Sequence, residues 1–135
     1  MRVLYICRAN VGRSQMAEAI FNNLQRKHFA VSAGLNPGEW EGKKIDSAKN
    51  VVICMKEIGF DLREKISKKI TKEMTEKVDK IIVIGERNNY PSYLTKNPKV
   101  TYWNIPDAGG TDLEFHRKTR DKIMIKIKEL IKTLK

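Results

Sequence analysis

The segment from Cys7 to Ser14 holds the residues best suited to chemistry. It reads Cys-Arg-Ala-Asn-Val-Gly-Arg-Ser and lies between a β-rich run and a stretch with helical spacing. Backbone N–H groups at such a turn can bind an anion, and the helix dipole adds partial positive charge. Arg13 can offer a planar fork of donors to two oxygens of a tetrahedral anion. We therefore predict a cradle for phosphate or another tetrahedral oxyanion, made by Arg8, Ala9, Asn10, Val11, Gly12, Arg13 and Ser14.

The positive electrostatic potential of this cradle is expected to favour the thiolate form of Cys7, which is the nucleophilic form. Ser14 can donate a hydrogen bond that stabilises the sulfur when it leaves. The predicted chemistry is in-line attack of sulfur on phosphorus, giving a phosphocysteine that water hydrolyses, while Arg13 stabilises the equatorial oxygens. A lone cysteine at a strand end can instead be a small buried hydrophobe. Its place at the first strand-to-helix turn favours catalysis, and the nucleotide-binding Gly-x4-Gly-Lys-Ser/Thr pattern is absent.

Cleavage of a phosphate ester also needs a proton for the leaving oxygen, which a nearby carboxylic acid can supply. Asp107 lies in a Pro-Asp-Ala-Gly-Gly-Thr-Asp segment after the last β-rich run. A turn aspartate or a helix cap is the common alternative role for such a residue. Asp112 fits the cap better because a long helix is predicted to start there. Asp107 is therefore the predicted general acid.

Strand and helix patterns alternate along the chain, which predicts a parallel sheet with helices on both faces. Because ligands bind at the carboxyl ends of such strands, this topology would place Cys7 and Asp107 at one sheet edge. The expected strands are 2–6, 29–33, 79–84 and 100–105. The expected helices are 14–27, a helix capped by Asp46 or Ser47 and ended by Gly59, a short one near Thr71, and one from about Asp112 to the end.

Composition limits the classes of protein to consider. The 135 residues fit a single domain, 1–135, and 41% of them are apolar without any run long enough to cross a bilayer. No signal-peptide pattern opens the chain, so we expect a cytoplasmic protein without a membrane partner. The net charge of +11 favours anionic partners. Solvated helix faces explain most of that charge, so binding of nucleic acid is a disfavoured alternative.

Neither cofactor nor metal is predicted. His28 and His116 have no companions at ligand spacing, and two cysteines are too few for a disulfide framework or a cysteine-rich metal site. Cys54 lies between Ile53 and Met55 in a predicted helix and is expected to be part of the core.

The segment Cys7–Ala17 resembles the signature of the low-molecular-weight protein tyrosine phosphatases and the related thioredoxin-coupled arsenate reductases. The likeness extends over nearly the whole chain, including Val31-Ser32-Ala33-Gly34 and Ile105-Pro106-Asp107. It implies the three-layer α/β/α fold of phosphotyrosine protein phosphatase I, with four parallel strands in the order 2-1-3-4. It also implies that Asn10 shapes the loop and that Ser32 supports Asn10 by hydrogen bonding. The implied substrate is a phosphotyrosine-containing protein or a small aryl phosphate.

Several departures from the family pattern bear on activity. Ala108 replaces the proline that normally follows the acid, and Gly109 and Gly110 replace the two tyrosines that wall the cleft in eukaryotic members. Trp40 falls in the loop that supplies the opposite aromatic wall, where it could stack on a substrate ring or lie against its own loop.

The segment 85–91 holds neither of the two further cysteines of the arsenate reductases, and Gly85 replaces an aspartate common in the phosphatases. Gly12 stands where some members hold a second loop cysteine. Without these thiols the chemistry lies closer to the phosphatase branch, and arsenate reduction would need an external thiol or redox partner.

Overall fold

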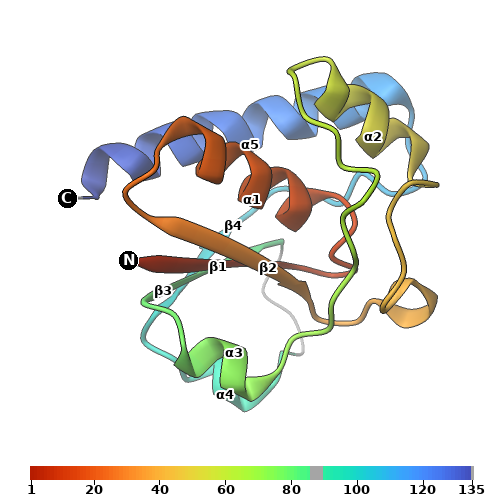
Figure 1. Cartoon of the computed structure of the whole chain (residues 1–135). Coiled ribbons are helices and arrows are strands. Elements are labelled where there is room, and N and C mark those ends of the chain that lie inside the picture. Colours follow the sequence, from red (N-terminus) through yellow and green to blue (C-terminus); the bar gives the residue numbers. More distant parts are fainter. Residues whose placement is uncertain (86–89, 135) are drawn as a thin grey trace.

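The computed structural model describes residues 1–85 and 90–134. Four strands form one parallel sheet (Figure 1): β1 (Arg2–Cys7), β2 (Phe29–Gly34), β3 (Lys80–Ile84) and β4 (Val100–Trp103). Their order is β2-β1-β3-β4, which confirms the predicted order 2-1-3-4. The helices are α1 (Arg13–Leu24), α2 (Lys49–Lys56), α3 (Lys72–Glu76), α4 (Ser92–Thr95) and α5 (Leu113–Thr133), with a 3₁₀ turn η1 (Gly38–Trp40).

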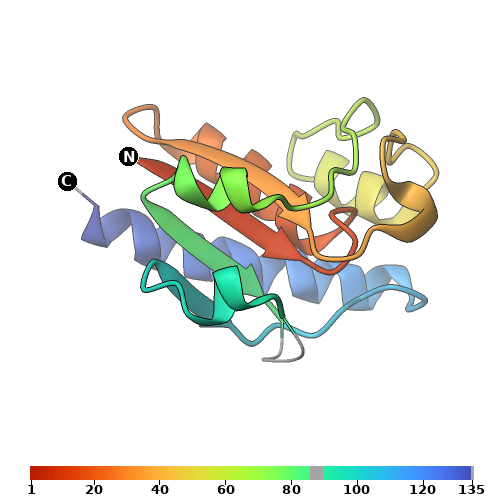
Figure 2. The same cartoon turned by 90° about the horizontal axis from the view of Figure 1, so that it is seen from below.

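The helices lie on both faces of the sheet, as a parallel sheet requires. In Figure 1, α1, α2 and α5 cover one face, while α3 and α4 lie together against the other; Figure 2 shows the same division from below. The predicted three-layer α/β/α arrangement is therefore confirmed.

Residues of β3 show why a continuous apolar run marks a central strand. Ile82 and Ile84 pack into the core cluster under α1 and α5, whereas Ile81 and Val83 pack into the cluster under α3 and α4. All four side chains are at most 1% exposed. Successive side chains of a strand point to opposite faces, so a strand covered on both sides needs apolar residues at every position.

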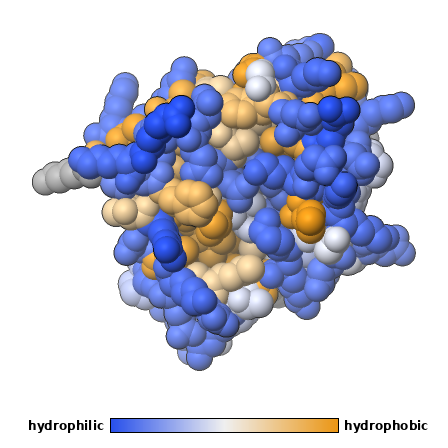
Figure 3. All heavy atoms as spheres, viewed as in Figure 1, coloured by the Kyte–Doolittle hydropathy of each residue, from blue (hydrophilic) through white to orange (hydrophobic). Residues whose placement is uncertain are grey.

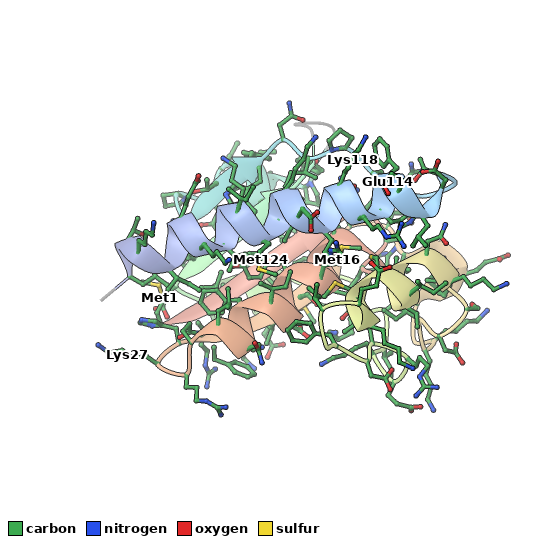
Figure 4. All side chains as sticks on the ribbon, turned by 90° about the horizontal axis from the view of Figure 1, so that it is seen from above. Met1, Met16, Lys27, Glu114, Lys118 and Met124 are labelled. Atoms are coloured by element: carbon green, nitrogen blue, oxygen red, sulfur yellow. The ribbon has the colours of Figure 1, made fainter. Side chains whose placement is uncertain are left out.

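Polar side chains cover most of the remaining surface. The face seen in Figure 3 is largely hydrophilic, with apolar atoms grouped in smaller patches between the charged residues. Helix α5 illustrates this division, because Ile123 and Ile127 are fully buried while Lys122 and Lys126 are exposed. In Figure 4, Met16 of α1 and Met124 of α5 lie along the seam between the two helices.

Some helices begin or end at residues other than those predicted. At the end of α1, side-chain hydrogen bonds to the backbone end the helix early. Helix α1 ends at Leu24, not Lys27, and Leu24 is exposed. The Gln25 side chain donates to the carbonyls of Phe21 and His28 and accepts from the N–H of His28, which turns the chain toward β2.

Helix α2 begins only at Lys49, and its N-cap residue Ala48 makes no side-chain cap, so the predicted cap by Asp46 or Ser47 is wrong. The helix ends at Lys56, two residues before the predicted end at Ile58, and Gly59 lies in the turn that follows with φ +95°.

The predicted cap of α5 by Asp112 is correct, and the structure adds a cap by Thr71 on α3. The Asp112 carboxylate accepts from the N–H of Phe115 at 2.9 Å, and the Thr71 hydroxyl accepts from Met74. The short elements η1 and α4 were not expected from the sequence. No helix in the described part of the chain combines the length and apolarity that a membrane span requires.

All four strands run in the same direction, so their carboxyl ends meet at one edge of the sheet. In Figure 1 this edge lies to the right, together with η1 and α2, whereas both termini lie at the opposite end. The Cys7–Arg13 loop leaves β1 at this edge, and the segment after β4 that carries Asp107 begins there.

Candidate active site

The loop from Arg8 to Gly12 is held from outside through its carbonyl groups. The carbonyl of Cys7 accepts from Leu35 N at 2.9 Å, and that of Arg8 accepts from Asn36 N at 2.7 Å. The Ser67 hydroxyl donates to the carbonyl of Ala9 at 2.7 Å. In contrast, the backbone N–H groups of residues 8–13 have no acceptor within the described part of the chain. The loop thus keeps these donors free, which is a condition for binding an anion.

Asn10 is the residue around which the loop is built. It is fully buried and has φ +57°, a left-handed conformation that asparagine tolerates better than most residues. Its Nδ2 donates to the Ser14 hydroxyl at 2.7 Å and to the Ser32 hydroxyl at 3.0 Å. Its Oδ1 accepts from Lys68 N at 2.9 Å and from Gln15 Nε2 at 3.2 Å. The contact to Ser32 is the one that the family resemblance implied.

These contacts fix the direction of a hydrogen bond to Cys7. The Ser32 hydroxyl lies 3.0 Å from a carboxylate oxygen of Glu18, to which it donates. Because the Ser14 oxygen already accepts from Asn10, its own proton is available for the Cys7 sulfur, 3.0 Å away. The N–H of Ser14 also donates to this sulfur at 3.4 Å. Two donors therefore aim at the sulfur of Cys7, a residue that is 3% exposed.

Arg13 begins α1 and is almost entirely buried at the wall of the site. Its Nη1 donates to the carbonyl of Ile105 at 2.9 Å, which orients the guanidinium. Its Nη2 lies 3.9 Å from a carboxylate oxygen of Asp107. A side chain at Gly85 would come within 3.1 Å of Nη1, so the glycine leaves room for this arginine.

The structure brings Asp107 to the mouth of the same site. Its side chain is 57% exposed, and one oxygen accepts from the N–H of Gly109 at 2.9 Å. The other oxygen faces Arg13. Ala108 stands in place of the family's proline, and Asp107 lines the same pocket as Cys7 and Arg13.

A pocket of about 590 Å³ opens above Cys7 between α2, η1 and the start of α5. Trp40 is half-buried on its wall and also contacts the apolar core, so both predicted roles for this ring are compatible with its position. The pocket extends past Gly109 and Gly110, which carry no side chains to close it. Sequence reasoning did not assign a site role to the other residues that line it, among them Met16, Lys49, Asn50, Val51, Thr111, His116 and Thr119.

Two glycines of the site act in different ways. Gly12 has φ −105°, so of the loop residues Asn10 and Gly12 only Asn10 has positive φ. Gly34 permits a close approach instead, since a Cβ there would lie 2.8 Å from the backbone carbon of Ala9. The end of β2 therefore packs directly on the cradle.

The remaining cysteine and histidines lie outside the reacting centre. Cys54 is fully buried in α2, and its burial raises the pKa of the thiol to about 11. Within residues 1–85 and 90–134, no group of three or more histidine, cysteine, aspartate or glutamate side chains is placed to hold a metal ion. Of the segment 85–91, residues 86–89 lie outside the described residues.

Comparison with known proteins agrees with this architecture. The structure superimposes with a TM-score of 0.83 on the low molecular weight protein tyrosine phosphatase from T. tengcongensis, at 27% identity over 99% of both chains. An arsenate reductase of Halalkalibacterium halodurans is 31% identical over 97% of this chain and 95% of its own. A low molecular weight protein-tyrosine-phosphatase of Acinetobacter johnsonii is 28% identical over 87% of this chain and 86% of its own.

The model of the family described as low molecular weight phosphotyrosine protein phosphatase matches residues 2–135. The chain belongs to this family. Its relatives include proteins named phosphatases and proteins named arsenate reductases, so family membership alone does not define the reaction.

Proposed function

We propose that this protein is a phosphomonoester hydrolase, specifically a protein tyrosine phosphatase, that acts through a phosphocysteine on Cys7. One observation carries the proposal: the loop that follows Cys7 has N–H groups without an acceptor in the described part of the chain, and Ser14 donates to the Cys7 sulfur. Residues 1–135 then form a single phosphatase domain. A nucleophilic thiol must stay reduced, which favours a reducing compartment such as the cytoplasm.

In the proposed first step, the Cys7 thiolate forms a bond to phosphorus while the bond to the leaving oxygen breaks. Asp107 gives its proton to that oxygen. The N–H groups of residues 8–13 and the guanidinium of Arg13 stabilise charge on the three equatorial oxygens. In the second step, water attacks phosphorus, Asp107 takes its proton, and the sulfur leaves as a thiolate held by the Ser14 hydroxyl.

The pocket supports an aryl phosphate as substrate, either free or on a phosphotyrosine-containing protein. Its volume of about 590 Å³ has room for a phenyl ring, and Trp40 offers an aromatic face beside it. Arg8 and Lys49 join Arg13 in the lining, against the single carboxylate of Asp107. This balance favours an anionic substrate, and phosphate and other tetrahedral oxyanions should compete for the cradle.

Phosphate release from p-nitrophenyl phosphate tests the proposal. The unaltered protein should release phosphate, and Cys7→Ser should lose at least about a thousandfold in rate, as nucleophile variants do. Acid-quenched protein should carry one phosphoryl group, detected by mass spectrometry and absent from Cys7→Ser. If the unaltered protein releases no phosphate and Cys7→Ser binds the ester equally poorly, the proposal is wrong.

Arsenate reduction with an external thiol is the second candidate, because arsenate has the same tetrahedral shape and a 31% identical relative is named an arsenate reductase. Cys7 would form a bond to arsenic with loss of water. An external thiol would then attack the Cys7 sulfur, releasing arsenite and leaving a mixed disulfide that a second thiol reduces. Production of arsenite that depends on both added thiol and Cys7 would support this activity. Its absence under conditions where phosphate esters are cleaved would remove it.

A further inference from the structure

The histidine of the pocket has one ring nitrogen held by the protein and the other left open. His116 lies in the first turn of α5, is 6% exposed and lines the pocket above Cys7. Its Nδ1 is 2.8 Å from the carbonyl oxygen of Asp112 and 3.3 Å from the Thr111 hydroxyl oxygen. Its Nε2 makes no hydrogen bond within the described part of the chain, and this atom keeps some exposure to solvent. This nitrogen therefore reaches the pocket.

The partners of Nδ1 fix the tautomer of the ring. The carbonyl of Asp112 can only accept, so Nδ1 carries a proton. The Thr111 hydroxyl donates its own proton to the carbonyl of Ala108 at 2.5 Å and can therefore only accept from His116 as well. In the neutral imidazole, Nε2 is then a hydrogen-bond acceptor directed into the pocket.

A neighbour of His116 adds a second hydrogen-bond acceptor. The Thr119 hydroxyl donates to the carbonyl of Phe115 at 3.0 Å, so its oxygen also accepts. Gly109 and Gly110 place no side chain between these groups and the space above Cys7. Asn50 of α2 donates to the carbonyl of Thr111 at 3.2 Å and ties this wall of the pocket in place. A leaving group that enters here meets hydrogen-bond acceptors on this side of the pocket.

We infer that His116 is a specificity-determining residue whose Nε2 accepts a hydrogen bond from a hydroxyl or N–H group on the leaving group of an aryl phosphomonoester. The inference rests on the proposed phosphatase function. A buried acceptor that is left without a donor costs free energy, so substrates that provide the donor are selected over those that do not.

The test compares kcat/KM for phenyl phosphate, its three hydroxyphenyl isomers and the three matching methoxyphenyl isomers, which lack the donor. At least one hydroxyphenyl isomer should exceed both phenyl phosphate and its methoxy counterpart by about three- to tenfold, the effect of one neutral hydrogen bond. No such preference, or a preference for the methoxy compounds, would overturn the inference.

Two variants separate recognition from structure. In His116→Asn the amide nitrogen can take the place of Nδ1 while the pocket group is lost, so the ratio of kcat/KM between each hydroxyphenyl ester and its methoxy counterpart should fall to the value set by shape alone. In His116→Gln the terminal amide reaches the place of Nε2, so the preference should persist. If His116→Gln instead slows every substrate while His116→Asn changes none, His116 only holds the loop and the inference fails. If the unaltered protein hydrolyses none of the esters, the proposed function fails, and this inference fails with it.

Discussion

At the scale of single residues, Asp107 and Arg13 divide the work of the proposed reaction. Arg13 is buried and oriented by the carbonyl of Ile105, so it can bind oxygens without moving. Asp107 is more than half exposed and lies 3.9 Å from the guanidinium, close enough to serve the leaving oxygen while remaining open to water. One residue thus supplies fixed charge, and the other can exchange protons with solvent.

Replacing Asp107 by Asn should slow cleavage in proportion to the need for a proton. For phenyl phosphate, we expect kcat to fall by about 10²- to 10⁴-fold, the usual contribution of a general acid. For 2,4-dinitrophenyl phosphate, whose leaving group needs no proton, the loss should be much smaller. Steady-state kinetics on both esters gives the comparison, and an equal loss on both would point to misfolding or to a different acid.

Asn10 should matter to stability as well as to activity. Asn10→Ala removes four hydrogen bonds, three of them buried, and places alanine at a left-handed position, so the free energy of unfolding should fall by about 2 kcal/mol or more. Asn10→Gly loses the same bonds without the backbone strain and should be the more stable variant. Urea denaturation of both measures the difference, and equal stability would mean that the conformation carries no cost.

At the scale of elements, the end of β2 supports the cradle by direct contact. A Cβ at Gly34 would lie 2.8 Å from Ala9 C and 2.9 Å from Asn10 N, both backbone atoms that cannot swing aside. The loop must therefore shift to accept any side chain at this position.

Gly34→Ala should weaken inhibition by inorganic phosphate by at least about tenfold and cost about 1–3 kcal/mol of stability, the usual effect of overpacking. Gly42→Ala is the control, because it has φ +79° and open space around its Cβ. It should lose about 1 kcal/mol from backbone strain while phosphate inhibition stays unchanged. Parallel inhibition and denaturation measurements decide, and unaltered phosphate affinity in Gly34→Ala would contradict the contact.

Helices α2 and α5 are joined by an ion-pair cluster around Glu57. Arg117 donates to both oxygens of Glu57, and Arg120 Nη1 donates to one of them at 2.7 Å and to the carbonyl of Cys54. Hydrogen bonds from Arg117, and then from Arg120, lower the pKa of Glu57 to about 2. The contacts formed on folding therefore favour the ionised form of Glu57.

This shift predicts a pH dependence of stability. Because the folded pKa lies below the unfolded one, the contribution of Glu57 is fully present above about pH 4.5 and is lost as pH falls toward about 2. The stability advantage over Glu57→Gln should shrink across this window. Thermal unfolding of both proteins in a pH series provides the measurement, and a constant difference between them would contradict the assignment.

The hydrophobic periodicity of the sequence was enough to predict the sheet and the loop. It could not predict contacts between residues that are distant in sequence. The run Ile81–Ile84 identifies a central strand, and a cysteine and an arginine at the first strand-to-helix turn identify the cradle. The late start of α2 and the role of His116 depend on how α2, α5 and the Asp107 loop meet in space. No local sequence pattern indicates how these elements pack together, so the sequence alone shows His116 as an isolated histidine.

At the scale of the whole molecule, the chain carries a net charge of +11, and its proposed substrates are anions. Long-range attraction should raise the rate of encounter with phosphate esters, and salt screens it over a Debye length of about 10 Å at 0.1 M. This explanation of the charge competes with nucleic-acid binding, which would show a steep salt dependence through many lysines.

Raising the ionic strength from about 0.02 to about 0.5 M should lower kcat/KM for aryl phosphates severalfold. The reaction of Cys7 with neutral iodoacetamide should change little over the same range, because an uncharged reagent is not steered. Stopped-flow and alkylation rates give both quantities. Equal salt sensitivity of the two reactions would mean that salt acts on the site itself and not on the approach.

The burial of Cys54 has a consequence for damage by peroxide. Oxidation of Cys7 would give a sulfenic acid, which is normally rescued by a neighbouring thiol. Cys54 is fully enclosed in α2, and Gly12 stands where related proteins can hold a second loop cysteine. Repair of an oxidised molecule must therefore come from small thiols or reductases in its surroundings.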